Sequence, residues 1–290
     1  MSLVITGATG QLGHRVVEVL LDAGVPASDI VAGGRNLAAA QDLADRGVDV
    51  RHIDYSDPAS LESGLVGADK VLIVSGTDVG QRVAQHTAVA EAALAAGARH
   101  LVYTSGPYAS TTSMLLAHEH AETEKSLTAL GAPVTFLRNG WYFENYTSQL
   151  PQYLDHSVIV GAAGDGRVSA ADRADYAEAA AAVLTGEGHE GAVYELGGDS
   201  SFTLAELAAV VARVSGRDIG YRRVSVSELD EILVGAGVPA PVAAILSDVD
   251  RAIDEGALRI ETGDLARLIG HPTRTLEAAV TEAYAALDRT

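Results

Sequence analysis

The sequence predicts an α/β fold in which one parallel β-sheet is covered by helices on both faces. In the first half of the chain, short apolar runs alternate with amphipathic stretches, and this alternation indicates repeated strand–helix–strand units. The apolar runs have few polar residues at alternate positions, which is typical of strands that are buried on both sides. A chain of 290 residues is long enough to build a sizeable core around such a sheet.

The elements of the first half follow one another in regular order. Strands are expected at 3–6, 29–32, 48–52, 70–75, 100–104 and 134–137. Helices are expected between them at 11–23, 37–46, 58–65, 80–96 and 117–130. This order predicts a doubly wound sheet, since each parallel strand needs a crossover helix to reach the next.

The pattern changes after residue 139, where helical stretches dominate. Helices are expected at 172–184, 203–214, 225–236, 239–255 and 273–287, and short strands at 157–160, 193–196 and 220–223. Two Gly-rich stretches, 161–166 and 197–199, predict loops. We therefore expect a first domain at 1–138 and a smaller, mostly helical substrate lobe at 139–290, with the two intertwined.

The composition excludes several classes of function. The chain has no cysteine, so disulfides, thiolate metal sites and cysteine nucleophiles are excluded. A formal net charge of −19 argues against a nucleic-acid partner and against attraction to an anionic membrane. The sequence opens without a basic and apolar leader, and no apolar run is long enough to span a bilayer. We expect a cytoplasmic protein that acts on a small molecule. The oligomeric state stays open, with a homodimer as the common case.

A glycine motif follows the first expected strand and opens the first expected helix. It reads Thr6-Gly7-Ala8-Thr9-Gly10-Gln11-Leu12-Gly13, with glycines spaced G-x-x-G-x-x-G. Gly7 allows a tight turn, Gly10 lets a diphosphate approach backbone N–H groups, and Gly13 allows the helix to pack closely on the strand. Phosphates are attracted to the free N–H groups of a helix N-terminus. The motif predicts dinucleotide binding in a Rossmann fold.

The residue after the second strand selects between the two nicotinamide dinucleotides. An Asp or Glu about 20 residues past the glycines holds the ribose 2′-hydroxyl of NAD. Here Arg35 stands 22 residues after Gly13. A guanidinium pairs with a 2′-phosphate, which a carboxylate would repel, so the sequence favours NADP(H). A surface arginine in an ordinary ion pair is the alternative.

Further small polar residues close the neighbouring strands. Ligands of open parallel sheets bind outside the carboxyl ends of the strands. We therefore expect Asp54, Ser75, Gly76 and Ser105 to contact the dinucleotide. For Asp54, a bond to the adenine amine and an Asx turn are equally compatible with the sequence.

Longer stretches resemble the NmrA-like family of atypical short-chain dehydrogenases, and within it the bacterial quinone reductases. The matching stretches run through almost the whole chain and are more specific than the glycine motif. They are 6–14, 79–82 with Gln85-His86, 103–105, 118–125, 137–146 (LRNGWYFENY), 161–166 (GAAGDG), 173–176, 188–191 and 268–273 (LIGHPT).

The resemblance implies that a quinone is reduced by hydride transfer from NADPH without a flavin. It also places two groups of residues at the coenzyme. The loop group is Gly7, Ala8, Thr9, Gly10, Gln11, Leu12 and Arg35, and the group on the nicotinamide side is Asn139, Gly140, Trp141 and Tyr142.

The candidate catalytic residues depart from the conventional pattern. Conventional short-chain dehydrogenases use a Tyr-x-x-x-Lys pair, but Ala121 stands four residues before Lys125. We expect Lys125 to bind the ribose or to stabilise the developing oxyanion, and a pair with Glu122 is the alternative. His118 lies one heptad earlier on the same helix face and is a candidate proton donor, although helix-surface histidines are common.

An aromatic cluster and a few rival functions complete the sequence-based expectations. Trp141, Tyr142, Phe143 and Tyr146 are candidates to hold a flat substrate, with core packing as the alternative, and Tyr142 is the candidate catalytic residue among them. The remaining histidines show no metal-ligand spacing, so no metal site is expected. A triphenylmethane-dye or other small-molecule reductase and a non-catalytic NADP-binding sensor are the alternative functions.

Overall fold

The computed structural model describes residues 2–287, which fold into two compact units. Unit 1 runs to Ala109 and includes Glu119–Asn139 and Arg173–Tyr194. Unit 2 comprises Ser110–His118, Gly140–Asp172 and the chain from Glu195 onward. The sequence predicts a boundary after residue 138 with the two parts intertwined, and the chain passes between the units at several points.

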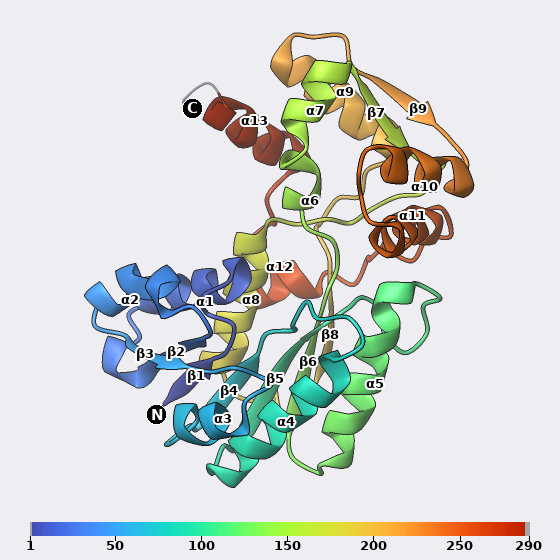
Figure 1. Ribbon diagram of the computed structural model, residues 1–290. Helices are drawn as coiled ribbons and strands as arrows, with labels where there is room; N and C mark the ends of the chain where they lie inside the picture. The colour runs from blue at the N-terminus through green and yellow to red at the C-terminus, as the bar shows by residue number, and fades with distance from the viewer. Residues whose placement is uncertain (1, 288–290) are drawn as a thin grey trace. The chain divides into compact units, whose positions relative to one another are not determined.

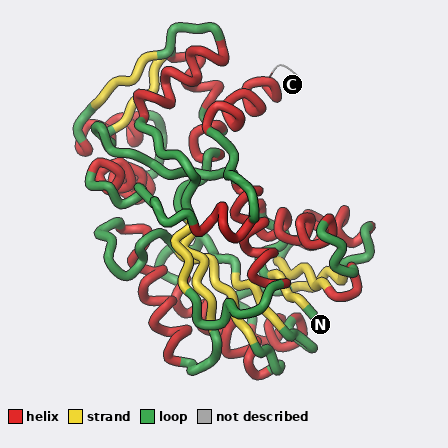
Figure 2. Tube along the Cα trace, turned by 180° about the vertical axis from the view of Figure 1, so that it is seen from behind, coloured by secondary structure: helices red, strands yellow, loops and turns green. Residues whose placement is uncertain are grey.

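Unit 1 is organised around a seven-stranded sheet with the order β3-β2-β1-β4-β5-β6-β8. Figure 2 shows its strands side by side with helices packed on them. The neighbouring pairs from β3 to β6 are parallel, and Val4 of β1 lies between Val31 and Val71. The strands are β1 (Leu3–Ile5), β2 (Ile30–Gly34), β3 (Asp49–His52), β4 (Lys70–Ile73), β5 (His100–Ser105), β6 (Val134–Asn139) and β8 (Val193–Leu196).

Helices cover both faces of this sheet, as Figure 1 shows. One face carries α1 packed against α8, and the other carries α3 packed against α4, with α5 beside them. The buried core on the second face joins sheet residues such as Ile73 and Tyr103 to Leu61, Val89 and Leu127 of these helices. The helices are α1 (Gln11–Asp22), η1 (Ala27–Asp29), η2 (Leu37–Ala40), α2 (Gln41–Asp45), α3 (Pro58–Gly64), α4 (Arg82–Ala95), α5 (Leu115–Ala129) and α8 (Arg173–Thr185).

Unit 2 is mostly helical around a small parallel sheet of β7 (Val158–Gly161) and β9 (Gly220–Arg223). Its core gathers Phe143, Tyr146, Phe202 and Leu207 with apolar residues of the later helices. A capping box between Thr203 and Glu206 begins the central helix α9. The helices are α6 (Glu144–Thr147), α7 (Leu150–His156), α9 (Leu204–Ser215), α10 (Val226–Gly235), α11 (Ala240–Asp254), α12 (Asp264–Ile269) and α13 (Leu276–Leu287).

The predicted fold class, a doubly wound parallel sheet, is confirmed. The main differences lie in short helices. The expected helix at 37–46 is a 3₁₀ turn followed by one short α-helix, and α6, α7 and α12 were not expected. Elements of four to seven residues span at most two helical turns, so they leave little hydrophobic periodicity to detect.

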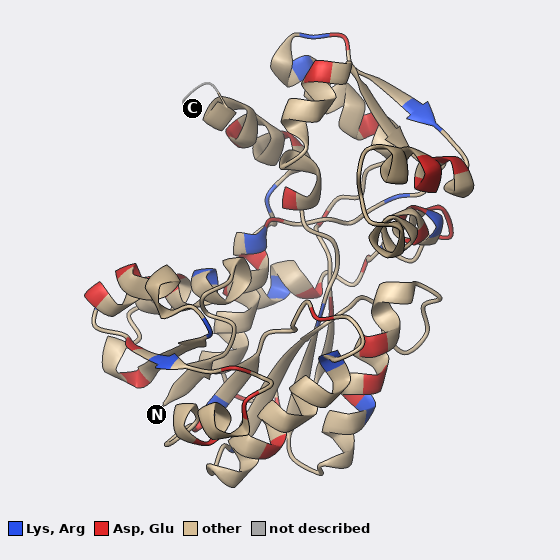
Figure 3. Ribbon diagram, in the orientation of Figure 1, with Lys and Arg blue, Asp and Glu red and all other residues tan. Residues whose placement is uncertain are grey.

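Charged residues are spread over the helices of both units, as Figure 3 shows. Acidic residues are not gathered in one place, and several of them form ion pairs with arginines. Within residues 2–287, no helix is both long and apolar enough to cross a bilayer.

The start of α1 lies unusually close to the turn that follows β1. A Cβ atom on Gly13 would lie 2.5 Å from the backbone oxygen of Gly7 and 2.9 Å from the Cα atom of Ala8. Gly7 itself has a φ of +63°, which a residue with a side chain rarely adopts. The two glycines therefore set the approach of helix to strand that the sequence predicts.

We expect Gly13→Ala to lower the free energy of unfolding by about 1–3 kcal/mol, because the added methyl group meets rigid backbone atoms. Gly235→Ala is the matched control, since Gly235 ends α10 and a methyl group added there would have no atom within 4 Å. The control should be neutral or stabilise by up to about 1 kcal/mol. Urea denaturation of both variants makes the comparison, and equal effects would contradict the backbone contact.

Candidate functional site

A cavity of about 350 Å³ opens in unit 1 at the carboxyl ends of β1, β2 and β4. Its walls come from the turn before α1, the ends of the neighbouring strands and the start of α4. The lining residues are Gly7, Thr9, Gly10, Gln11, Leu12, Gly34, Arg35, Ile53, Asp54, Tyr55, Val74, Ser75, Gly76, Thr77, Asp78 and Gln85. This is the edge at which open parallel sheets bind ligands.

The first turn of α1 is suited to an anion. Gly10 is the N-cap residue and supplies no capping side chain, and no acidic residue stands in the first turn. The N–H groups there are free of intrahelical acceptors. The Gly10 N–H bonds to the Gly7 carbonyl at 2.9 Å, which closes the turn. A diphosphate fits this backbone cradle, which a side chain at position 7 would strain.

Two residues of the predicted glycine motif support the cradle without lining it. Ala8 is fully buried, and its N–H donates to the Gly33 carbonyl at 2.8 Å. Gly13 is buried against Gly7. Both residues therefore fix the position of the loop relative to β2 and β1.

Arg35 and Asp78 lie together at the open side of the cavity. The guanidinium Nη1 of Arg35 is 3.9 Å from Oδ2 of Asp78, and both side chains are largely exposed. The Asp78 carboxylate also accepts a hydrogen bond from Gln85 at 3.3 Å. Arg35 is thus held by a loose ion pair that a stronger anion can displace.

Asp54 forms the Asx turn that is one of the two alternatives from the sequence, and its bond to the adenine amine stays a prediction. Its Oδ1 accepts from the Ser56 N–H at 2.9 Å, which is the bond of an Asx turn. Asp54 also lines the cavity, as does the neighbouring Tyr55. The Tyr55 hydroxyl donates to the Val74 carbonyl at 2.8 Å and lies 2.5 Å from Oγ1 of Thr6, so it joins three strand ends.

A buried histidine, His86, supports the loop after β4 through a hydrogen bond. The Gly76 N–H donates to Nε2 of His86 at 2.9 Å, so Nε2 is unprotonated and Nδ1 carries the proton near Thr123. Burial and, secondarily, the charge of Arg82 lower the pKa of His86 to about 3. His86 therefore stays neutral and acts as a fixed acceptor for a loop that lines the cavity.

A second, half-buried histidine extends this network. Arg82 donates to Nε2 of His120 at 2.8 Å, and Nδ1 of His120 lies 2.8 Å from the Tyr103 hydroxyl. Burial and the nearby Arg82 hold the pKa of His120 well below its ordinary value. Sequence reasoning missed Thr77, Asp78, Gln85 and the role of His86. The Gln85-His86 pair belongs to a family-like stretch and was the one available signal.

Ser105 and Lys125 have protein partners. Ser105 is buried and donates to the Glu124 carboxylate at 2.6 Å, and Arg138 donates to the same carboxylate. Lys125 is 71% exposed and forms an ion pair with Glu122 at 2.7 Å. Neither residue lines the cavity. Their expected contacts with the coenzyme stay predictions.

The remaining predicted residues fall at the boundary between the units or in unit 2. Asn139 is buried at the end of β6 in unit 1. His118 is exposed near the start of α5, in the segment assigned to unit 2. Gly140, Trp141 and Tyr142 belong to unit 2, where the Gly140 N–H donates to the Leu196 carbonyl and Tyr142 pairs with Ala171. Their proposed roles toward the nicotinamide stay predictions.

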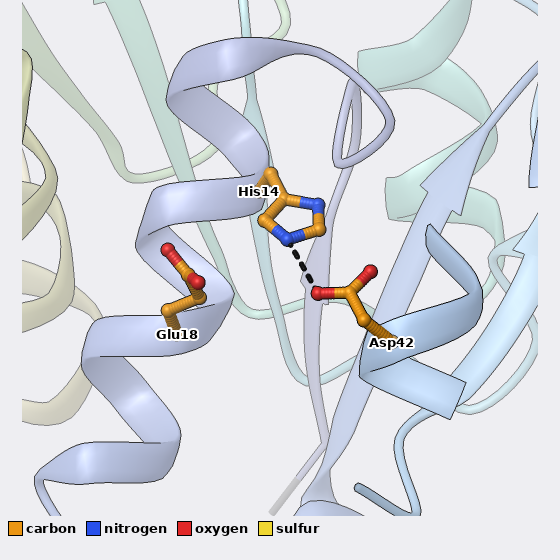
Figure 4. A group of neighbouring side chains, drawn as sticks. All are labelled: His14, Glu18 and Asp42. Carbon is orange, nitrogen blue, oxygen red and sulfur yellow. Dashed lines mark hydrogen bonds and ion pairs between the residues drawn. The ribbon is translucent and has the colours of Figure 1, made fainter. Parts of the chain in front are cut away.

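One group of potential metal ligands occurs within the described residues, and Figure 4 shows it. His14 and Glu18 of α1 and Asp42 of α2 have ligand atoms within 4.8 Å of one another. His14 hydrogen-bonds Asp42 at 2.9 Å, and Glu18 forms an ion pair with Arg15 at 3.2 Å. None of the three lines the cavity. These contacts explain why the three side chains lie together. The first links α1 to α2, and the second lies along α1.

The sheet, the glycine turn and the arginine after β2 define a dinucleotide-binding protein of the Rossmann type. The sequence profile of the NmrA-like family matches residues 1–271. The chain belongs to the NmrA-like family, as the sequence stretches predict.

Known relatives are similar along the whole chain. Quinone oxidoreductase 2 of Escherichia coli is 49% identical over 97% of this chain and 98% of its own length. The structure of that NADPH-dependent enzyme with NADPH has a TM-score of 0.94 and covers 97% of this chain and 99% of its own. The Citrobacter triphenylmethane reductase complexed with NADP(H) is 40% identical, with a TM-score of 0.92 and coverage of 97% and 100%.

We expect His86→Gln to flatten the pH dependence of stability. Because the pKa of His86 is about 3 in the folded protein and about 6.5 when unfolded, the unfolded chain gains a proton first as the pH falls. This group therefore adds stability above pH 6.5 and loses it as the pH falls towards 3. Glutamine still accepts from Gly76 but does not titrate.

The slope of the unfolding free energy between pH 6 and pH 4 should decrease by about 1.4 kcal/mol per pH unit in this variant. His156→Gln, which replaces an exposed histidine at the end of α7, is the matched control. Chemical denaturation at a series of pH values provides the slopes. Identical slopes for wild type and His86→Gln would contradict the assignment of His86 as a buried neutral acceptor.

Proposed function

We propose that this protein is an NADPH-dependent oxidoreductase that reduces quinones. The observation that carries the proposal is the 49% identity, along almost the whole chain, to an NADPH-dependent quinone oxidoreductase. The cavity at the carboxyl ends of the strands supports it independently, because it combines a glycine cradle with an exposed guanidinium.

The residues of unit 1 divide the binding of NADPH between them. The N–H groups at the start of α1 hold the diphosphate, and Arg35 binds the 2′-phosphate. Asp54 and Tyr55 border the adenosine side, and Ser75 and Gly76 border the ribose on the other side. When bound, NADPH supplies a hydride.

The acceptor needs little further assistance from the protein. A quinone that takes up a hydride becomes a hydroquinone anion, and phenols titrate near ~10, so this anion forms far more readily than an alkoxide. A proton, supplied by His118 or by water, completes the hydroquinone. The protein contributes position and charge, which explains why the missing tyrosine of conventional dehydrogenases is tolerated.

Lys125, His118 and Tyr142 are the proposed participants at the acceptor. Lys125 would stabilise the anion if it exchanged its exposed partner Glu122 for the substrate, and the 71% exposure of its side chain leaves it free to do so. His118 is exposed and accessible as a proton donor. Tyr142, with Asn139 to Trp141, is proposed to border the nicotinamide side.

Reduction of a cationic triphenylmethane dye is the second candidate, because a triphenylmethane reductase matches the whole chain at 40% identity. Oxidation of NADPH, followed at 340 nm with 1,4-benzoquinone and with a triphenylmethane dye in parallel and without added flavin, separates the two. Turnover of the quinone supports the proposal. Turnover of the dye alone, or tight NADPH binding with no turnover, would overturn it.

A cytoplasmic location, a homodimer and the absence of a nucleic-acid partner complete the proposal. The net charge of −19 supports the last of these, since nucleic-acid binding depends on clustered basic residues.

We expect Arg35→Ala to weaken NADPH binding by about 10- to 100-fold, because charge-assisted hydrogen bonds to the 2′-phosphate are lost. NADH binding should change little, since NADH lacks that phosphate. Arg46→Ala removes an exposed arginine that pairs with Asp22 and is the matched control. Calorimetric titration with both coenzymes measures the ratio, and parallel losses for NADPH and NADH would contradict the role of Arg35.

We expect Asp78→Asn to tighten NADPH binding by about 3- to 10-fold, because Asp78 lies 3.9 Å from Arg35, competes with the 2′-phosphate for it and repels that phosphate. The effect on NADH should be smaller, and high salt should reduce the difference. Asp45→Asn, an exposed change in α2, is the control. Weaker NADPH binding in Asp78→Asn would show that Asp78 supports the site.

A further inference from the structure

Unit 2 contains a cavity of its own, also of about 350 Å³. Its walls combine aromatic side chains from the start of the unit with aliphatic side chains from α10 and α11. The largest of the apolar walls are Trp141, Tyr153, Ile159, Leu229, Leu233 and Leu246. A cavity of this size and lining suits a small organic molecule with one or two rings.

An unpartnered hydroxyl group lies in this wall. Tyr146 is 8% exposed, and its Oη atom is buried without a hydrogen-bond partner. The ring is fixed by Phe202, whose centroid lies 5.6 Å away in a T-shaped arrangement. A buried polar group without a partner is destabilising, so a hydroxyl held here is suited to a bound donor or acceptor.

The cavity also contains an acidic group without a cationic partner. Oδ2 of Asp250 accepts from the Ala162 N–H at 2.6 Å, and its other oxygen makes no hydrogen bond within residues 2–287. Two nearby arginines are engaged elsewhere: Arg251 pairs with Asp248 and Glu255. Arg223 lies near two other carboxylates, at 3.6 and 3.9 Å.

The negative charge of Asp250 acts on the aromatic walls. Burial, and next the charge of Asp250, raise the pKa of Tyr146, of Tyr153 and of Tyr221, the last to about 12. Burial raises the pKa of Asp250 itself to about 6. One carboxylate therefore dominates the electrostatics of a cavity whose walls are otherwise uncharged, and buried charges in proteins are usually paired.

We propose that this cavity binds an aromatic ammonium cation, whose ammonium group donates to Asp250 and Tyr146 and whose ring packs beside Trp141. A cation pairs with the carboxylate and is attracted by the faces of tryptophan and tyrosine rings. An anion is repelled by Asp250, and an uncharged alcohol leaves the carboxylate without a counter-charge. The inference concerns binding alone and does not depend on the reductase proposal.

A matched pair of probes tests the charge requirement. The probes are 2-(1-naphthyl)ethylammonium and 2-(1-naphthyl)ethanol, which share one skeleton and differ in charge. Trp141 is the only tryptophan of the chain, so protein labelled with 5-fluorotryptophan has one fluorine resonance, and it reports on this cavity. The full-length protein is titrated without NADPH, and a saturable shift of that resonance measures binding.

Two variants assign the contacts. Asp250→Asn should weaken binding of the cation by about 10-fold or more and leave binding of the alcohol unchanged. Tyr146→Phe should weaken the cation by about 2- to 10-fold without loss of stability, because its hydroxyl has no protein partner. Tyr284→Phe, on α13 and outside the cavity, is the matched control.

The expected result is a saturable shift with the cation, a weaker shift with the alcohol, and the stated losses in the two variants. Circular dichroism and thermal unfolding confirm that each variant is folded. The proposal is overturned if the alcohol binds as tightly as the cation, if Asp250→Asn leaves the affinity for the cation unchanged, or if the resonance of Trp141 does not move.

Discussion

The contact between the backbone of Gly7 and the flank of Gly13 is the constraint on which the cofactor site depends. With no side chain at either position, the first helix starts close to the end of β1. Its unpaired N–H groups then face the same edge of the sheet as Arg35 and the loop after β4. If α1 started farther from β1, the N–H groups for the diphosphate and the guanidinium for the 2′-phosphate would no longer lie at the spacing that one dinucleotide needs.

Hydrogen bonds between buried polar groups connect the glycine turn to the neighbouring strand ends and loops. Tyr55 and Thr6 connect the ends of β1, β3 and β4. His86 then accepts a hydrogen bond from Gly76 and so fixes the loop after β4. The lowered pKa values of His86 and His120 keep both rings neutral. Their hydrogen bonds to the loops therefore do not change over the pH range in which an ordinary histidine gains a proton. The shape of the binding edge is therefore insulated from moderate changes in pH.

The sequence predicted the sheet and the glycine turn well because both leave local signals. Buried parallel strands are continuous apolar runs, and a tight turn with a positive φ requires glycine. Asp78 left no such signal, and Gln85 left one only as part of a family-like stretch, because both reach the cavity through the tertiary arrangement of the loop after β4 and the start of α4. Tyr146 was a candidate from the aromatic cluster, but Asp250, more than 100 positions later, left no signal that both residues line one cavity in unit 2. The i,i+3 spacing predicted an ion pair between Lys125 and Glu122 as one alternative, and the structure contains that pair.

The passage of the chain between the two units has a consequence for how the protein is made. Helix α8, which packs against α1 in unit 1, lies in the Arg173–Tyr194 segment, after a long stretch that belongs to unit 2. During synthesis the apolar side of α1 therefore stays uncovered until the ribosome has passed residue 185. A fragment that ends after β6 lacks this cover, so neither unit can be obtained by cutting the gene once. The smallest piece that completes the coenzyme-binding unit extends through Tyr194 and carries part of the second unit with it.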